Sequence, residues 1–288
     1  MLGFCLLAPL GDSLAKLLSG EIPLLELLLA RFAVQALLLP PLVYAQGSAI
    51  VLSPRLRWLT LLRTLLHLAG SACMYLALRY LPVADAIAIA YVMPFLLLVL
   101  GKYLLQEAVG KSRLLACIVG FFGTLLVIQP NFAAIGLPAL LPLAVAVIFA
   151  FYMLVTRQIA KALDPVVQQA ASGLIAVPIL LLVFLLGGDQ PDLQLVWPAP
   201  HIAALLLSIG VIGTLAHLLM TWSLRLAPTA TLAPMQYLEI PAATLFGWLI
   251  FRDLPNGIAA IGIAVTMAAG LYIILREQKI APGAPPLA

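Results

Sequence analysis

Charged residues are scarce in this chain. Only 9% of the 288 residues are Asp, Glu, Lys or Arg, whereas 64% are hydrophobic. A soluble domain usually carries about a quarter charged residues, and a water-soluble fold of this length could not hide so much apolar surface in one core. The composition therefore excludes a soluble protein and predicts one that lies in a membrane.

Alternating polarity is also missing from the long apolar runs. Inside the hydrocarbon of a bilayer every backbone polar group must be paired within the protein, which leaves only helices and closed barrels. The runs at residues 114–128 and 258–275 lack the alternation of a barrel strand. We therefore expect an all-α integral membrane protein.

Cysteine is rare, and clusters of basic or catalytic residues are absent. Cys5, Cys73 and Cys117 are an odd number and lie far apart in apolar stretches, which excludes a disulfide framework and a metal site. The net charge is +4, but the basic residues occur singly between apolar runs, so we expect no nucleic-acid partner. No paired aspartates, Ser/His dyad or helical zinc motif is present. We predict no enzyme, no catalytic residues, no metal and no cofactor.

The apolar runs divide into ten segments at prolines, glycines and charge clusters. Each segment has about 17–25 residues, enough to cross roughly 30 Å of hydrocarbon. The first lacks a basic start and carries Asp12 and Lys16 where a signal peptide would be cleaved, so we interpret it as a retained span. The predicted spans are approximately 2–18, 23–46, 57–79, 82–101, 112–129, 137–157, 166–186, 201–223, 229–250 and 257–275.

Basic residues near the span ends predict the orientation, because they favour the cytoplasmic side. With a cytoplasmic N-terminus, the outside connections hold only Lys16, Arg79 and Arg252. The inside connections then hold Arg55, Arg57, Lys102, Lys111, Arg113, Arg157, Lys161, Arg225, Arg276 and Lys279. We therefore predict that both termini are cytoplasmic.

The two halves of the chain resemble each other. A shift of 146 residues lays Arg79 on Arg225, Pro82 on Pro228, Tyr91 on Tyr237, Gly101 on Gly247 and Glu107 on Asp253. Five spans per half is an odd number, so the second half must enter the membrane inverted. Inverted repeats are typical of alternating-access transporters, whose substrate site lies near the midplane. We predict a first repeat over residues 1–130, a second over 137–276 and a cytoplasmic tail over 277–288.

Three segments carry a resemblance to a known family. They are ARFAVQALLLP in the second span, RYLPVADAIAIAYVMPFLLLVLGKYLLQE in the third and fourth, and APTATLAPMQYLEIPAATLFGWLIFRD in the eighth and ninth. They resemble the drug/metabolite transporter superfamily, and within it the ten-helix EamA type with two five-helix repeats, including YddG-like amino acid exporters. The resemblance covers nearly the whole chain and implies transport without ATP and cytoplasmic termini.

The expected function is that of a secondary active or facilitative transporter. We predict a monomer in the bacterial inner membrane that exports amino acids or related amphipathic metabolites by alternating access, with protons as a partner or with no coupling. The export direction follows from the resemblance alone. The spacing at residues 12–16 and 81–85 also resembles importers of riboflavin or S-adenosylmethionine, which is the alternative.

Ionisable groups within the spans are the first site candidates, because burying one costs about 2.5–3.5 kcal/mol at a helix centre. Glu239 lies two residues before Pro241 and is either a site for a substrate amine or proton, or a structural carboxylate paired with an arginine. Arg63 and His67 share a helix face. Arg63 either binds a substrate carboxylate or pairs with an acid, for which the candidates are Asp12, Glu26 and Glu239; His67 either lines the cavity or packs in the core.

Further candidates lie on other spans. His217 has threonines on its helix face, a pattern typical of a cavity wall or a helix contact. The side chains of Tyr75, Tyr91, Tyr152 and Tyr237 form either an apolar wall with hydroxyl tips or ordinary helix packing. Pro94 and Pro241 are either hinges or static kinks. We expect Arg31 to serve topology and packing, and Asp12 to pair with Lys16. The cavity is expected between spans one, three, four, six, eight and nine.

Overall fold

The computed structural model describes residues 1–107, 109–128, 136–252 and 256–280, and all of their secondary structure is helical. This confirms the all-α prediction. The long helices are α1 (Leu2–Leu18), α2 (Leu24–Ala45), α3 (Pro54–Leu78), α6 (Lys111–Ile128), α8 (Leu140–Ala160), α9 (Pro165–Leu186), α10 (Pro200–Leu226) and α13 (Gly257–Ile280). The helix α13 runs into the predicted tail as far as Ile280, and residues 281–288 lie outside the described part.

Shorter elements complete the chain. They are α4 (Val83–Ala90), α5 (Met93–Leu104), α11 (Thr229–Met235) and α12 (Glu239–Phe246), with the short turns η1 (Leu137–Ala139), η2 (Pro191–Leu193), η3 (Gln236–Leu238) and the π-helical η4 (Gly247–Phe251). Seven helical stretches of the described residues are long and apolar enough to cross a membrane, with α4 and α5 taken together. The protein is therefore a multi-pass membrane protein, and the count of ten spans stays a prediction.

Two predicted spans are interrupted in the structure. The span predicted at 82–101 is divided between α4 and α5, and Pro94 lies in the first turn of α5. The span predicted at 229–250 is divided by η3, and Pro241 lies in the first turn of α12. Proline is tolerated at a helix start, where its missing N–H would have no intrahelical partner. Both prolines therefore mark the start of a half-helix.

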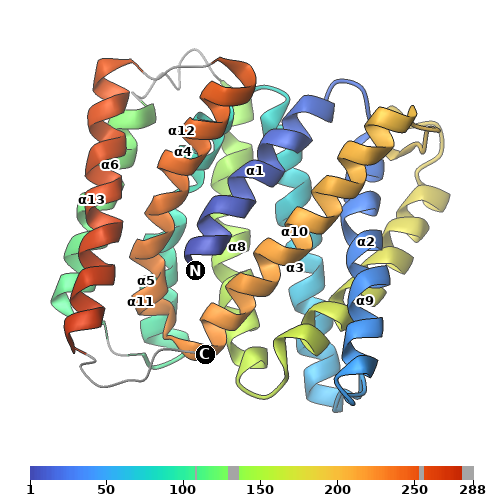
Figure 1. Cartoon of the computed structure of the whole chain (residues 1–288), viewed down its shortest axis with the longest axis horizontal. Helices are drawn as coiled ribbons and strands as arrows, with labels where there is room; N and C mark the ends of the chain where they lie inside the picture. Colours follow the sequence, from blue (N-terminus) through green and yellow to red (C-terminus); the bar gives the residue numbers. More distant parts are fainter. Residues whose placement is uncertain (108, 129–135, 253–255, 281–288) are drawn as a thin grey trace.

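The helices form a bundle with a pair of packed helices at each lateral edge. At one edge α6 packs along α13, and at the other α2 packs along α9 (Figure 1). Between these edges α3 packs on α8 and α1 packs on α10, while α12 lies against α1 and α5 against α8. This arrangement places α1, α3, α4, α8, α10 and α12 around the centre of the bundle.

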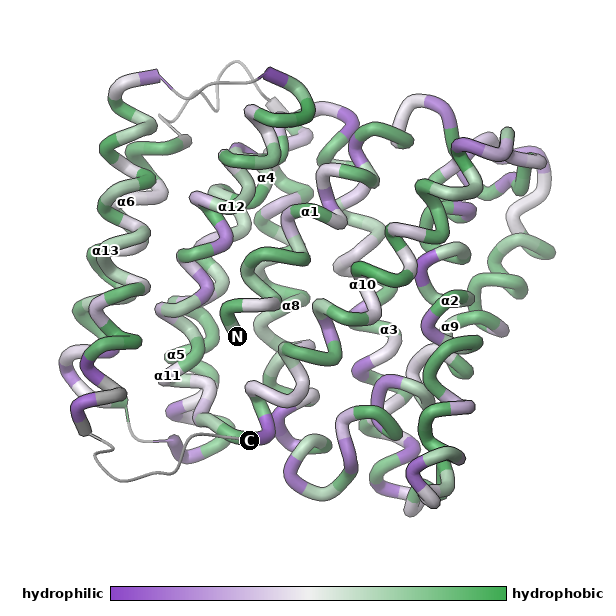
Figure 2. The backbone as a smooth tube through the Cα atoms, viewed as in Figure 1, coloured by the Kyte–Doolittle hydropathy of each residue, from purple (hydrophilic) through white to green (hydrophobic). Residues whose placement is uncertain are grey.

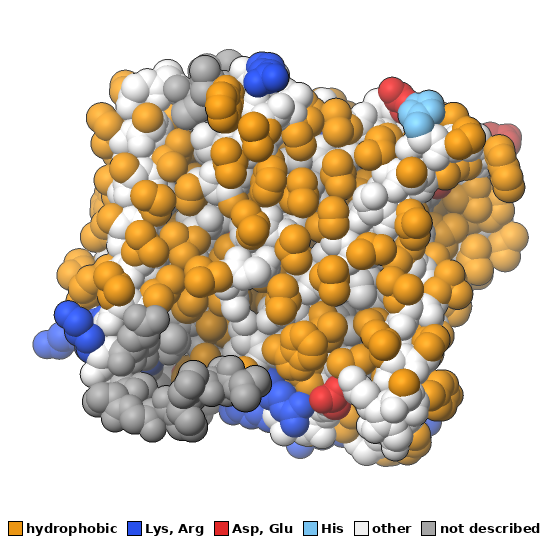
Figure 3. Space-filling model, viewed as in Figure 1, with side chains coloured by type: hydrophobic (Ala, Val, Ile, Leu, Met, Phe, Trp, Pro, Cys, Tyr) orange, Lys and Arg blue, Asp and Glu red, His pale blue; other side chains and the backbone are white. Residues whose placement is uncertain are grey.

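The outer surface of the bundle is apolar. Hydrophobic residues dominate the middle of the tube in Figure 2, and most of the visible face in Figure 3 is hydrophobic. Large apolar side chains such as Leu37 and Leu185 are exposed. The visible Lys and Arg side chains lie mostly at the lower end of the bundle (Figure 3). Such a surface suits contact with lipid, because the hydrocarbon replaces water around these side chains.

Candidate functional site

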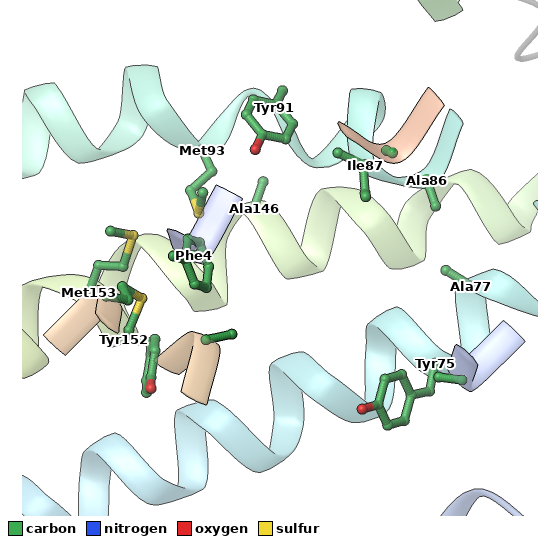
Figure 4. Packing of buried hydrophobic residues seen from close by; sticks show 14 of the residues in the cluster. Phe4, Tyr75, Ala77, Ala86, Ile87, Tyr91, Met93, Ala146, Tyr152 and Met153 are labelled. Carbon is green, nitrogen blue, oxygen red and sulfur yellow. The ribbon is translucent and has the colours of Figure 1, made fainter. Parts of the chain in front are cut away.

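A cavity lies in the centre of the bundle. Its empty space is about 740 Å³, including the part that is open to solvent. The helices that line it are α1, α2, α3, α4, the start of α5, α8, α10 and α12. Its charged or polar side chains are Asp12, Arg31, Ser71, Tyr75, Tyr91, His217 and Glu239, and its apolar wall includes Phe4, Met74, Met93, Phe149 and Met153. Figure 4 shows Phe4, Met93 and Met153 gathered beside α8.

The two interrupted helices line the cavity unevenly. From the interrupted helices it is lined by α4, by Met93 at the start of α5, and by Glu239 at the start of α12. The remainder of α5 and all of α11 lie on the other side of the two interruptions and do not line it. In Figure 1, α4 and α12 are in the upper half and α5 and α11 in the lower half. The cavity therefore lies away from the end where Lys and Arg gather.

A cluster of nitrogen-containing side chains forms one wall of the cavity. Arg31 of α2 donates from Nη1 to the hydroxyl of Tyr75 at 2.8 Å. Its Nη2 lies 3.0 Å from Nδ1 and 3.4 Å from Nε2 of His217, and 3.4 Å from Nε2 of His67. Nδ1 of His217 is also 3.1 Å from the carbonyl of Gly213. A neutral imidazole has one donor and one acceptor nitrogen, so in either tautomer one ring nitrogen of His217 can accept from Arg31. Neutral groups therefore hold this guanidinium.

Arg63 lies behind this wall, outside the cavity lining. Its side chain is fully buried, and its nitrogens donate to Thr156 Oγ1 at 3.0 Å, Ser172 Oγ at 2.5 Å and the Tyr152 hydroxyl at 2.8 Å. Of the two alternatives for Arg63, pairing with an acid is not observed among the described residues, where three hydroxyl groups from α8 and α9 take the place of a carboxylate. Glu26, one of the acids considered, accepts instead from the backbone N–H of Val196 at 2.9 Å.

Glu239 faces the cavity from the start of α12. It is only 8% exposed, and its Oε1 has no hydrogen-bond partner among the described residues. Tyr91 lies beside it, but the single hydroxyl proton of Tyr91 goes to the carbonyl of Gln236 at 2.6 Å. The alternative of a structural ion pair is not observed for Glu239 within the described chain, so this carboxylate has an acceptor atom left for a ligand or a proton.

Tyrosine positions that match under the 146-residue shift come together. The rings of Tyr91 and Tyr237 have centroids 5.5 Å apart, and the Tyr237 hydroxyl donates to the carbonyl of Cys117 at 3.0 Å. Only Tyr91 of the two lines the cavity. The Tyr91 hydroxyl donates to the carbonyl of Gln236, the first residue of η3, and thereby links the end of α4 to the start of η3. The Tyr237 hydroxyl links η3 to α6 in the same way.

Polar contacts close the half of the bundle opposite the cavity. Glu107 accepts from the Thr229 hydroxyl at 2.6 Å and from the backbone N–H of Ala230 at 3.2 Å, at the start of α11. Its other oxygen lies 3.5 Å from Nε of Arg157, the last basic residue of α8. Arg157 also donates to the carbonyls of Leu224 and Arg225. These contacts join the ends of α5, α8, α10 and α11.

At the end of the bundle nearer the cavity, an ion pair lies at the protein surface. Arg79 after α3 lies 2.7 Å from Asp192 in η2. The hydrogen bond from this guanidinium is the main cause that lowers the pKa of Asp192 below its ordinary value. Lys16, at the end of α1, donates to the carbonyl of Leu81 at 2.9 Å. Asp12, which we expected to serve as its partner, lines the cavity instead.

The predicted site residues thus divide into two groups. Tyr75, Tyr91, His217 and Glu239 line the cavity. Arg63, His67, Tyr152 and Tyr237 are buried but outside its lining. Sequence reasoning missed Arg31 and Asp12 as lining residues, although each is an ionisable group inside a span and carried the same signal as Arg63.

Comparison with known proteins identifies the family. The EamA-like transporter family matches residues 1–129 and 136–276. Three similar relatives are a riboflavin transporter of Brucella anthropi (26% identity, 86% of this chain, 87% of the relative), an S-adenosylmethionine uptake transporter of Rickettsia bellii (25%, 93% and 90%) and the pseudopaline exporter CntI of Pseudomonas aeruginosa (24%, 92% and 88%).

A solved crystal structure has the same fold, with a TM-score of 0.76, 20% identity and coverage of 96% of this chain and 97% of that one. These matches do not confirm the predicted resemblance to YddG-like exporters in particular. Their functional names are those of transporters and not of enzymes. The chain belongs to the EamA-like transporter family and is a membrane transporter of small molecules.

Proposed function

We propose that the protein is a monomeric carrier of the bacterial inner membrane, with both termini in the cytoplasm, which works by alternating access between two inverted repeats. The packing supports this proposal. In the two predicted repeats, α1 is the counterpart of α8, α3 of α10, and α5 of α12. The contact of α3 with α8 therefore matches that of α10 with α1, and the contact of α5 with α8 matches that of α12 with α1. The pairs α6 with α13 and α2 with α9 exchange with themselves.

The one-sided cavity is the observation that carries the proposal. A carrier exposes its site to one side at a time, and its cavity must therefore be closed at the other side. Here the cavity lies on one side of the helix interruptions, and the contacts of Glu107 and Arg157 close the other. Basic residues favour the cytoplasmic side, and the visible Lys and Arg side chains lie mostly at the end opposite the cavity (Figure 3). In this proposal the cavity therefore faces the outside, and the structure corresponds to the outward-facing state.

The charges in the cavity indicate the substrate class. Arg31 offers a positive group, Asp12 and Glu239 offer negative ones, and aromatic and methionine side chains form the rest of the wall. A zwitterion with an apolar or aromatic side chain would satisfy all three features. We therefore propose amino acids or related amphipathic metabolites as the exported substrates.

Import of a larger metabolite is the second candidate function. It is favoured by the relatives named as riboflavin and S-adenosylmethionine transporters. Of these two molecules, S-adenosylmethionine has both an amino acid zwitterion and an aromatic ring system, whereas riboflavin has no ammonium and carboxylate pair. The cavity charges therefore favour S-adenosylmethionine within this alternative.

The test is uptake into proteoliposomes that contain the purified full chain. Labelled phenylalanine, leucine, riboflavin and S-adenosylmethionine would be compared with protein-free vesicles, with and without an imposed pH gradient. Saturable amino acid flux that unlabelled analogues compete with is expected, and its response to the gradient tests proton coupling. Flux of riboflavin or S-adenosylmethionine alone would replace the first candidate by the second.

A further inference from the structure

Arg31 is placed as a ligand-binding group would be. It is 6% exposed, and it lines the cavity. Three neutral side chains from α3 and α10, Tyr75, His67 and His217, contact its two terminal nitrogens. A guanidinium held in this way keeps a fixed orientation, which is the condition for bidentate recognition of a planar anion.

The wall around Arg31 carries more positive than negative charge. Arg63 lies behind His67 and is bonded only to hydroxyl groups. Within the described part of the chain, neither guanidinium has a carboxylate at ion-pairing distance. Asp12 is near enough to interact electrostatically with Arg31, so this part of the bundle holds two arginines and one acid. Buried charges are stable only when they are paired or well bonded, and this surplus favours an anionic partner.

The opposite charge comes from another helix of the cavity lining. In Figure 1, α2, which carries Arg31, and α12, which begins with Glu239, lie on either side of α1. Glu239 has an oxygen without a hydrogen-bond partner. The cavity therefore has an anion-attracting group on α2 and an ammonium-attracting carboxylate on α12.

We infer that Arg31 binds the carboxylate of the transported zwitterion, and that Tyr75, His67 and His217 are positioning residues for its guanidinium. The inference rests on the proposed function, because it assigns one group within the proposed substrate site. Arg31 supplies a charge, and the N–H groups that it does not direct at Tyr75, His67 and His217 supply donors, so the ligand must present a planar carboxylate to the wall formed by α2, α3 and α10.

The first experiment varies the ligand and needs no substitution in the protein. Binding of labelled phenylalanine and S-adenosylmethionine to the detergent-purified chain is competed with hydrocinnamate, phenylalanine and phenylalaninamide. We expect the acid to compete about tenfold better than its amide, the effect of one charge-assisted bidentate contact. Hydrocinnamate, which has the carboxylate but no amine, should still compete. Equal competition by acid and amide would overturn the inference.

The second experiment varies the protein. In Arg31→Gln the preference for acid over amide should disappear, whereas Arg31→Lys should keep part of it, because lysine retains the charge without the planar fork. Arg225→Gln is the matched control, since this arginine is exposed and pairs with Asp164 far from the cavity. An undiminished acid preference in Arg31→Gln would overturn the inference alone. Failure of the wild-type chain to bind either labelled probe would overturn the proposed function together with it.

Discussion

The imidazole rings of His67 and His217 stack, with their centroids 4.2 Å apart and their planes 25° apart. His67 comes from α3 and His217 from α10, helices that are counterparts in the two predicted repeats. Nη2 of Arg31 lies 3.4 Å from Nε2 of His67 and 3.0 Å from Nδ1 of His217. The pair therefore joins the two halves of the bundle at the cavity wall and provides acceptors for one guanidinium.

This stack predicts different effects for the ring and for its nitrogens. His217→Phe keeps an aromatic ring but removes the acceptor for Arg31, so we expect binding of labelled phenylalanine to weaken by about tenfold, the cost of one lost hydrogen bond to a charged group. His217→Gln, which retains an acceptor, should lose less. Equal affinity in His217→Phe and the wild type would contradict the positioning role.

Glu239 provides the complementary prediction. Removing its charge in Glu239→Gln should weaken phenylalanine binding by about tenfold, because a charge-assisted contact to the ammonium is lost. Competition by hydrocinnamate, which has no amine, should stay unchanged. If competition by hydrocinnamate weakens as much as binding of phenylalanine, then Glu239 maintains the shape of the cavity and does not bind the amine. A pH-gradient response that disappears only in this variant would assign it a proton instead.

The contacts of Glu107 and Arg157 predict a gate on the closed side. In Glu107→Gln the ion pair is lost and the hold on the start of α11 is weakened, so this half of the bundle should open more often. We expect faster modification of a reporter, Ala233→Cys, by a membrane-impermeant thiol reagent, because Ala233 is fully buried in α11.

The reporter requires a background in which Cys5, Cys73 and Cys117 are replaced by serine. Arg225→Gln is the control, because its pair with Asp164 is exposed and exposed pairs contribute little. An unchanged labelling rate in Glu107→Gln would show that the closed half does not depend on this contact.

The paired prolines predict a change in rate without a change in affinity. Pro94 and Pro241 follow the interruptions of their spans, and alanine at either position would allow a continuous hydrogen-bonded helix. If the interruptions act as hinges, Pro94→Ala and Pro241→Ala should lower the maximal flux several-fold while the Kd for phenylalanine stays constant. Unchanged flux in both variants would assign the prolines to static kinks.

Asp192 predicts how stability depends on pH at the cavity end. Its pKa is lower in the folded chain than the ordinary 3.8 because Arg79 donates to it. A carboxyl with a lowered pKa stabilises the fold above the ordinary value, and this contribution is lost as the pH falls through the folded value. The Tm difference between the wild type and Asp192→Asn should therefore be constant above about pH 5 and shrink below it. A difference that grows on acidification would contradict the ion pair.

Local sequence signals predicted much of the fold. The apolar runs predicted helices, and Pro94 and Pro241 lie where the fourth and ninth predicted spans are interrupted. The pairing of Arg63 could not be predicted, because Thr156 and Ser172 come from helices far along the chain. Which side of a helix faces the cavity depends on rotation about its axis, and neighbouring spans determine that rotation. For this reason the sequence, in which Arg31 is a lone arginine in an apolar span, predicts a role in topology and packing and not its place in the cavity lining.

The most direct test of the account is counterflow in proteoliposomes. Vesicles loaded with unlabelled phenylalanine or S-adenosylmethionine are diluted into a trace of the same labelled compound. An alternating-access carrier returns from the outside to the inside with a labelled molecule bound, so the account predicts transient accumulation of label above the equilibrium level and saturation at high concentration. Flux that rises linearly with concentration and never exceeds equilibrium would indicate a channel and contradict the central claim.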